Sequence, residues 1–156
     1  PGGWSLESAT KLFEAELVAR DYENGKRMFS AGKCVACHRF RDAGGNLGPS
    51  LDGIASRAVP RLVEDILDPN RNVDPMFRMT TITLRSGEMK AGLNLRTDGD
   101  RVLLLDPATQ QDVVVAKSEV KETNVSAVSP MPAAFETVLS EQHFFDLLDY
   151  LRSPTN

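Results

Sequence analysis

Cys34-Val35-Ala36-Cys37-His38 is the stretch that decides the fold, because a C-x-x-C-H run is the attachment signature of c-type haem. Two thiols three positions apart can add to the two vinyl groups of one haem, and one helical turn presents both sulfurs and the following imidazole to the same porphyrin face. His38 would then bind the iron as the proximal ligand through a ring nitrogen. These five residues predict one covalently attached haem c, with its iron, per chain.

Three other kinds of site use the same cysteine spacing. A thioredoxin-like redox pair needs a βαβ context, which the sequence around Cys34 lacks. A zinc site needs two further ligands, and the chain holds only two cysteines and two histidines, His38 and His143. A disulfide between Cys34 and Cys37 would close too tight a loop to stabilise the protein much. Haem attachment is therefore the favoured interpretation of the motif.

Size, composition and charge are those of one small acidic domain. The chain has 156 residues, of which 41% are hydrophobic and only 6% aromatic, so a buried haem would add a large apolar plate to a modest core. A net charge of −4 argues against a nucleic-acid partner. No stretch has the length of a transmembrane helix, and no signal peptide is visible. Because thioether-linked haem is assembled outside the cytoplasm, we expect a periplasmic or otherwise exported protein.

Hydrophobic periodicity is helical at both ends of the chain and changes in the middle. Helical spacing covers residues 5–20 (Leu17 and Val18 included), 21–30, 61–67 and 140–152. Strand-like runs separated by Gly, Pro and Asp turn signals cover 77–84, 88–95, 101–105 and 112–116, with a possible fifth strand near Val120. The pattern predicts a mainly α fold interrupted by a small antiparallel sheet at about residues 77–125.

Several short motifs, taken together, resemble those of a class I cytochrome c. They are the segments 24–29, 34–38, 47–49 and 129–132. A narrower likeness to the planctomycete–verrucomicrobial type of haem-binding domain depends on segments 48–53, 68–70 and 146–151 and on the strand-rich insertion. The resemblance implies a class I cytochrome c fold over residues 21–156, with residues 1–20 as an N-terminal extension or linker helix. It also implies that the first and last helices of this fold cross, which would bring Gly25 and Phe29 against Leu147, Tyr150 and Leu151.

The resemblance assigns the second axial ligand to a methionine just before the closing helix, and Met131 matches that place. Flanking prolines would stiffen its loop. A methionine that only fills core space is the alternative. Met76 and Met79 are the fallback ligands, and His143 is the histidine that a His–haem–His centre would need.

Two further residues acquire roles from the resemblance. Pro49 is expected near the proximal ring, where a backbone carbonyl accepts the His38 Nδ1 proton, although a simple turn proline would look the same in sequence. Arg57 matches an arginine that could pair with a haem propionate, with a solvated surface charge as the alternative.

The function implied is one-electron transfer by a chain that is not an enzyme, with a redox partner protein or a fused oxidoreductase domain as its partner. The alternatives are an electron-relay domain of a larger exported oxidoreductase and, from another class, a haem sensor or peroxidase-like site. The last of these would leave the iron open opposite His38, and the sequence offers no distal His and Arg pair to activate peroxide.

Overall fold

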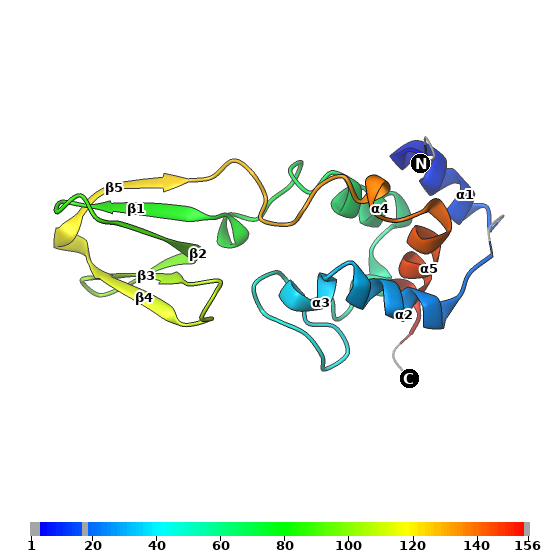
Figure 1. The fold of residues 1–156 in the computed structure, drawn as a ribbon, viewed down its shortest axis with the longest axis horizontal. Coiled ribbons are helices and arrows are strands. Elements are labelled where there is room, and N and C mark those ends of the chain that lie inside the picture. The colour runs from blue at the N-terminus through cyan, green and yellow to red at the C-terminus, as the bar shows by residue number, and fades with distance from the viewer. Residues whose placement is uncertain (1–3, 17–18, 155–156) are drawn as a thin grey trace. The chain divides into compact units, whose positions relative to one another are not determined.

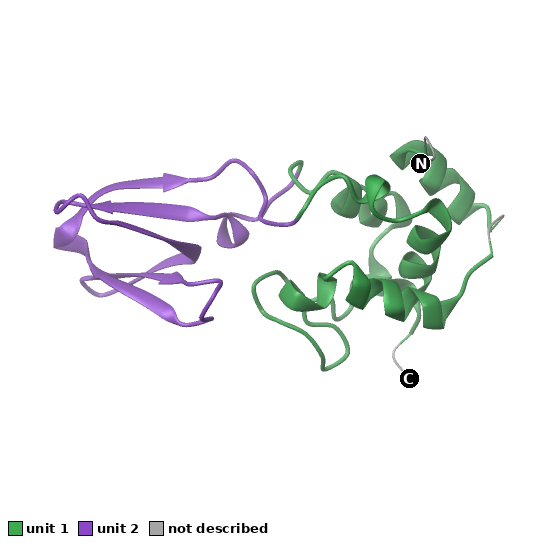
Figure 2. Cartoon of the chain, viewed as in Figure 1, with its two compact units in different colours: residues 1–71, 132–156 green, residues 72–131 purple. Residues whose placement is uncertain are grey.

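The computed structural model describes residues 4–16 and 19–154 and divides the chain into two compact units (Figure 2). The helical unit comprises residues 1–71 and 132–156, and the sheet unit comprises residues 72–131. The sheet unit is therefore wider than the insertion of 77–125 expected from the sequence. Within the described ranges, five α-helices and one five-stranded sheet are formed, so the expectation of a mainly α chain is confirmed only in part.

Figure 1 shows the elements of the helical unit. Its helices are α1 (Leu6–Glu14), α2 (Tyr22–Ala31), α3 (Cys34–Cys37), α4 (Val59–Leu67) and α5 (Glu141–Arg152), with short 3-10 turns η1 (Ile54–Ser56) and η4 (Phe135–Thr137). The side chains of Ser5, Asp21 and Ser140 accept hydrogen bonds from backbone N–H groups at the starts of α1, α2 and α5. Local capping chemistry thus sets where these three helices begin.

Helix α1 is shorter than predicted and belongs to the helical unit. It ends at Glu14 rather than at residue 20, and Glu16 has a left-handed φ of 55° that no helix continues through. Leu17 and Val18, which were expected to continue the helix, lie outside the described residues. The buried Phe13 ring lies 6.2 Å from that of Phe145 in α5. Residues 4–14 therefore add to the core that α5 forms.

Helices α2 and α5 cross at very close range. A Cβ on Gly25 would overlap the carbonyl oxygen of Asp146 and lie 2.8 Å from the Cβ of Tyr150. The Phe29 and Tyr150 rings are 5.8 Å apart, as the predicted crossing requires. The buried carboxylate of Asp146 accepts hydrogen bonds from the Asp21 N–H and the Asn24 side chain at the start of α2. Only glycine fits this contact between the two helices.

The sheet unit contains β1 (Thr80–Leu84), β2 (Met89–Asp98), β3 (Arg101–Leu105), β4 (Asp112–Ala116) and β5 (Val120–Val125), together with the 3-10 turns η2 (Pro75–Phe77) and η3 (Lys117–Glu119). The strand order is β4-β3-β2-β1-β5, with all neighbours antiparallel. The fifth strand therefore extends the opposite edge from β4. The core of the sheet unit consists of Ile82, Leu84, Val102, Leu104 and Val115.

This strand order requires the sheet to curl. Four strand spacings of about 4.8 Å would separate β4 from β5 in a flat sheet, about 19 Å. The chain from Ala116 to Val120 spans at most about 15 Å even when extended, and it forms the 3-10 turn η3. A register shift between Leu93 and Arg96, with Asn94 at a left-handed φ of 51°, gives β2 the bulge at which such a sheet bends.

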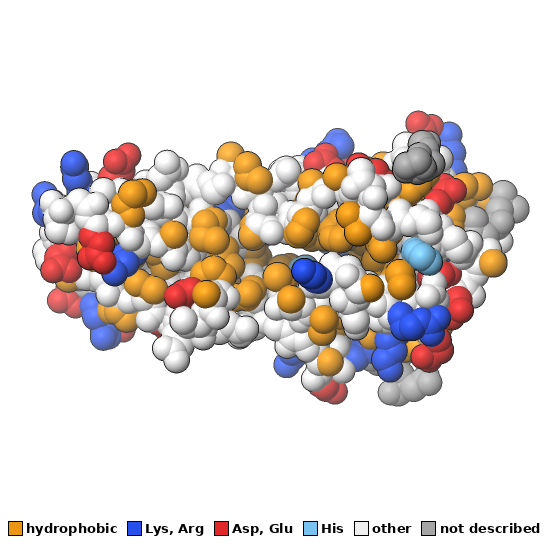
Figure 3. All heavy atoms as spheres, viewed as in Figure 1, with side chains coloured by type: hydrophobic (Ala, Val, Ile, Leu, Met, Phe, Trp, Pro, Cys, Tyr) orange, Lys and Arg blue, Asp and Glu red, His pale blue; other side chains and the backbone are white. Residues whose placement is uncertain are grey.

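Charged side chains of both signs are mixed on the surface, whereas the exposed apolar side chains are concentrated in the sheet unit. Lys and Arg side chains are interspersed with Asp and Glu side chains on the face that Figure 3 shows. Most of the large exposed apolar residues belong to the sheet unit: Met76, Met89, Leu95, Val114, Val125 and Val128. The small core of this unit thus leaves part of its apolar side chains in contact with solvent.

Candidate haem-attachment site

Both cysteines of the motif lie on the single helical turn α3. Lys33 precedes the turn with a left-handed φ of 59°, and the His38 N–H donates to the Cys34 carbonyl oxygen at 2.8 Å. The two thiols are free; Cys34 is half-buried and Cys37 is exposed. One turn thus places two unbonded sulfurs next to a histidine, as the predicted chemistry needs.

The electrostatics of Cys34 argue against a redox-active thiol pair. Burial raises the pKa of the Cys34 thiol to about 11, so it is neutral at neutral pH. A thioredoxin-like cysteine instead needs a lowered pKa, because the thiolate is the attacking species. Among the described residues, no three His, Cys, Asp or Glu side chains are grouped as a metal-ion site requires.

The His38 ring is held by the segment that contains Pro49. Its Nδ1 lies 2.7 Å from the Pro49 carbonyl oxygen, which accepts the ring proton and thereby assigns the lone pair to Nε2. Gly48 lies against the ring, where a Cβ would be 2.9 Å from the His38 Cε1. A side chain at position 48 would have to displace the imidazole. The Pro49 carbonyl and Gly48 together orient the ring with Nε2 available to a metal.

These residues fit haem c. The group needs two thiols for its vinyl carbons, and α3 carries them three positions apart. It needs an imidazole nitrogen with a free lone pair and a fixed ring plane, and His38 provides both through its bond to Pro49. Cys34, Cys37, His38 and Pro49 are thus brought together in the helical unit.

Arg57 has a protein partner in this structure. Its Nε pairs with the Asp65 carboxylate of α4, and its backbone oxygen accepts a hydrogen bond from the Arg152 side chain at 2.7 Å. The pairing through Nε leaves the two Nη groups to donate elsewhere. Contact with a haem propionate stays a prediction.

The predicted distal ligand and its fallbacks belong to the sheet unit. Met131 is the last residue of this unit; it is half-buried, and its N–H donates to the Ser129 hydroxyl at 3.1 Å. Met76 is 50% exposed in η2, and Met79 is half-buried just before β1. Ligation by Met131 stays a prediction.

His143 lies on the first turn of α5 and is exposed, as expected for a surface histidine. Its backbone N–H donates to the capping hydroxyl of Ser140 at 3.2 Å. The backbone of His143 therefore takes part in the N-terminal cap of α5, independently of its side chain.

Three residues of the site were not singled out in the sequence: Asp52, Arg39 and Arg41. Asp52 accepts hydrogen bonds from the Arg41 N–H at 3.1 Å and the Arg39 guanidinium at 3.0 Å. The bond from Arg41 is the main cause of a pKa of Asp52 below its usual value. The only sequence signal was the position of Asp52 inside segment 48–53, since nothing in the order of residues pairs it with Arg39 or Arg41.

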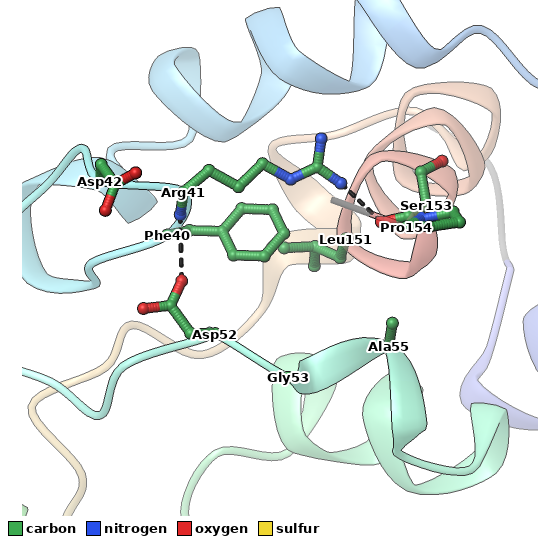
Figure 4. Close-up of a pocket in the computed structure, with 9 residues that line it drawn as sticks. All are labelled: Phe40, Arg41, Asp42, Asp52, Gly53, Ala55, Leu151, Ser153 and Pro154. Carbon is green, nitrogen blue, oxygen red and sulfur yellow. Dashed lines mark hydrogen bonds between the residues drawn. The ribbon is translucent and has the colours of Figure 1, made fainter. Parts of the chain in front are cut away.

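A cavity of about 380 Å³ adjoins this second group of residues (Figure 4). It is lined by Phe40, Arg41, Asp42, Asp52, Gly53, Ala55, Leu151, Ser153 and Pro154. None of Cys34, Cys37 and His38 is among them. The cavity is thus separate from the attachment motif, although its walls include the loop that follows His38.

Among the described residues, no helix has the length and apolar composition needed to cross a bilayer. A comparison with curated proteins found no match. The sequence pattern of one protein family, described as Cytochrome c, matches residues 22–114, more than half of the chain. The matched residues contain the α3 turn with its two free thiols and the oriented imidazole of His38. The chain therefore belongs to the cytochrome c family, whose members bind haem c covalently and carry electrons.

Proposed function

We propose that the chain is a monohaem electron carrier in which Cys34 and Cys37 hold the haem through thioether bonds and His38 and Met131 are the axial ligands. The observation that carries the proposal is the 2.7 Å contact between His38 Nδ1 and the Pro49 carbonyl oxygen, which leaves Nε2 as the only ring nitrogen able to bind a metal. The bound haem supplies one-electron chemistry between ferric and ferrous iron.

His38 contributes more than a bond to the metal. Donation of its Nδ1 proton to Pro49 increases the electron density on Nε2 and keeps the ring from rotating. A more basic imidazole favours the ferric state, so this contact lowers the reduction potential. The thioether of Met131 acts in the opposite direction, because it favours ferrous iron. The two ligands therefore shift the reduction potential in opposite directions.

The support for Met131 is its place in the sequence. It stands ten residues before the start of α5 and between two prolines, which restrict its loop. Arg57 fits a supporting role, since its Nη groups remain able to donate to a propionate while Asp65 holds Nε. No side chain of the motif has to move a proton for an electron to be transferred.

The proposal extends to where the protein works and what it meets. Covalent haem attachment favours a periplasmic or otherwise exported location and a redox protein, or a fused oxidoreductase domain, as the partner. An electron-relay domain of a larger oxidoreductase would use the same ligands. In both cases the role of this chain is electron transfer rather than catalysis.

Optical spectra of the purified holoprotein, oxidised and reduced, test the ligand set. The weak near-infrared sulfur-to-iron band should be present in the wild type, absent in Met131→Ala and retained in Met79→Ala, the matched control. The ferrous wild type should not bind carbon monoxide. A band that survives in Met131→Ala would exclude Met131 as the ligand. Carbon monoxide binding by the wild type would favour a sensor or another ligand-binding haem.

A further inference from the structure

The segments that contain His38 and Pro49 are joined by successive hydrogen bonds. The Gly48 N–H donates to the Cys37 carbonyl oxygen at 2.9 Å, and the Leu51 N–H donates to the Arg39 carbonyl oxygen at 2.8 Å. The bond between His38 Nδ1 and Pro49 lies between these two. The position of the Pro49 carbonyl therefore depends on the bonds on either side of it.

Asp52 provides the next bonds beyond Leu51. Its Oδ1 accepts the Arg41 N–H at 3.1 Å, and its Oδ2 accepts from the Arg39 side chain at 3.0 Å and the Ser50 hydroxyl at 3.1 Å. One carboxylate thus binds two residues of the segment after His38 and one residue of the segment after Pro49. Asp52 thus connects the segment that follows His38 with the segment that follows Pro49, at the end of this pairing that is farther along the chain from α3.

The backbone at Arg41 makes this bond more than an ordinary surface contact. Arg41 and Asp42 have left-handed φ values of 53° and 63°, a region that is uncommon for residues other than glycine, asparagine and aspartate. Within this left-handed turn, the Arg41 N–H donates a hydrogen bond to the Asp52 carboxylate, as Figure 4 shows. Two backbone bonds between Phe40 and Ala43, at 2.8 and 3.2 Å, close this turn, and the Asp52 carboxylate joins the closed turn to the 48–52 segment.

The side chain of Arg41 ties the same turn to the end of α5. Its guanidinium donates to the Ser153 carbonyl oxygen at 2.6 Å and to the Tyr150 carbonyl oxygen at 3.2 Å, and it also bonds the Tyr22 hydroxyl. It lies 4.8 Å from the centre of the Phe40 ring. Arg41 is thus held in place by α5, and Asp52 joins the segment that contains Pro49 to Arg41.

We propose that Asp52 is a positioning residue for the axial histidine, which keeps the Pro49 carbonyl on His38 Nδ1 by joining the 48–52 segment to Arg39 and Arg41. This inference depends on the proposed function, because it takes His38 as the iron ligand. The hydrogen bonds of the Asp52 carboxylate come from Arg39, Arg41 and Ser50 rather than from His38. Asp52 acts only through the 48–52 segment, by limiting how often the hydrogen bond between His38 Nδ1 and the Pro49 carbonyl oxygen breaks.

The first test is solvent exchange of the His38 Nδ1 proton in the reduced, diamagnetic holoprotein, followed by NMR. Mutation of a residue that orients a metal-bound histidine typically costs about 10–100-fold in metal affinity or activity. Asp52 acts one bond further out, so we take the lower end of that range and expect about a tenfold faster exchange in Asp52→Ala. Asp52→Asn keeps an oxygen that can accept the Arg41 N–H and should stay within about threefold of the wild type. Asp52→Ser, which is too short to reach Arg41, should behave like Asp52→Ala.

Asp42→Asn is the matched control, because it removes one carboxylate from the neighbouring surface and tolerates the left-handed backbone. The reduction potential should be higher in Asp52→Ala than in Asp42→Asn, since a weaker Pro49 bond makes Nε2 a poorer donor to ferric iron. Equal exchange rates and equal potentials in these two variants would overturn the inference. The wild-type spectrum tests haem attachment and the sulfur ligand independently of Asp52, so a failure of the proposed function would be visible before any variant is made.

Discussion

Replacing Gly25 by alanine tests the closest contact between two helices in the protein. A Cβ at this position would overlap the Asp146 carbonyl oxygen and lie 2.8 Å from the Tyr150 Cβ. Ordinary contact between carbon atoms is about 3.5–4.0 Å, so α2 and α5 would have to separate by about 1 Å. Both neighbours are rigid parts of α5, and neither can rotate out of the way.

The expected effect combines two opposing terms. Alanine is about 1 kcal/mol better than glycine inside a helix. Overpacking a tight interface costs about 1–3 kcal/mol, and a clash with backbone belongs at the upper end of that range. Separation of the helices also loosens the contact between Phe29 and Tyr150, whose rings are 5.8 Å apart. We therefore expect Gly25→Ala to lower the free energy of unfolding by about 2 kcal/mol.

The assay is guanidinium unfolding of the holoprotein, followed by haem absorbance, because the attachment residues Cys34, Cys37 and His38 lie in the helical unit. Ser30→Ala is the matched control, because Ser30 is exposed on the same helix and gains only the higher helix propensity of alanine. If Gly25→Ala unfolded at the same denaturant concentration as Ser30→Ala, or later, the close contact would not limit the crossing and the argument would be refuted.

Three other outcomes follow from the described contacts. Met131→Ala should lower the reduction potential and admit exogenous ligands to the ferrous iron, with an unchanged potential as the contrary result. Asp146→Ala should lower the free energy of unfolding by about 3 kcal/mol, measured by the same denaturation, because it removes a buried carboxylate that accepts hydrogen bonds from the Asp21 N–H and from the side-chain amides of Asn24 and Gln142. The backbone N–H of Ala108 holds the pKa of Asp106 below its usual value of 3.8. The stability that this carboxylate contributes is therefore present above pH 3.8 and is lost as the pH falls through the lower pKa of the folded protein. NMR titration of that carboxyl should give a midpoint below 3.8, and Asp106→Asn should lessen the loss of stability in acid.

Elements defined by local chemistry were predicted well from the sequence. Strands β3 and β4 have the predicted limits, 101–105 and 112–116, because turn residues bound them on both sides. Helices α2 and α5 start beside the capping residues Asp21 and Ser140. The thiol pair and His38 were predictable for a similar reason, since one helical turn fixes the geometry among neighbours in sequence.

Pairing between distant segments was not predictable in this way. The alternation of residues 120–125 does not specify whether β5 adds to β4 or to β1, because either edge offers the same backbone groups. Nor did the helical period of residues 5–20 show that α1 ends at Glu14, where the left-handed backbone of Glu16 takes the chain out of the helix.

The sequence by itself determined that this chain attaches a haem and which histidine follows the two cysteines, because these depend on the spacing of five consecutive residues. Only the tertiary structure decided what orients that histidine. The Pro49 carbonyl is 11 residues from His38, and Asp52 is 11 residues from Arg41. Such bonds form only when the loop has folded back on itself, so no local pattern of residue types records them.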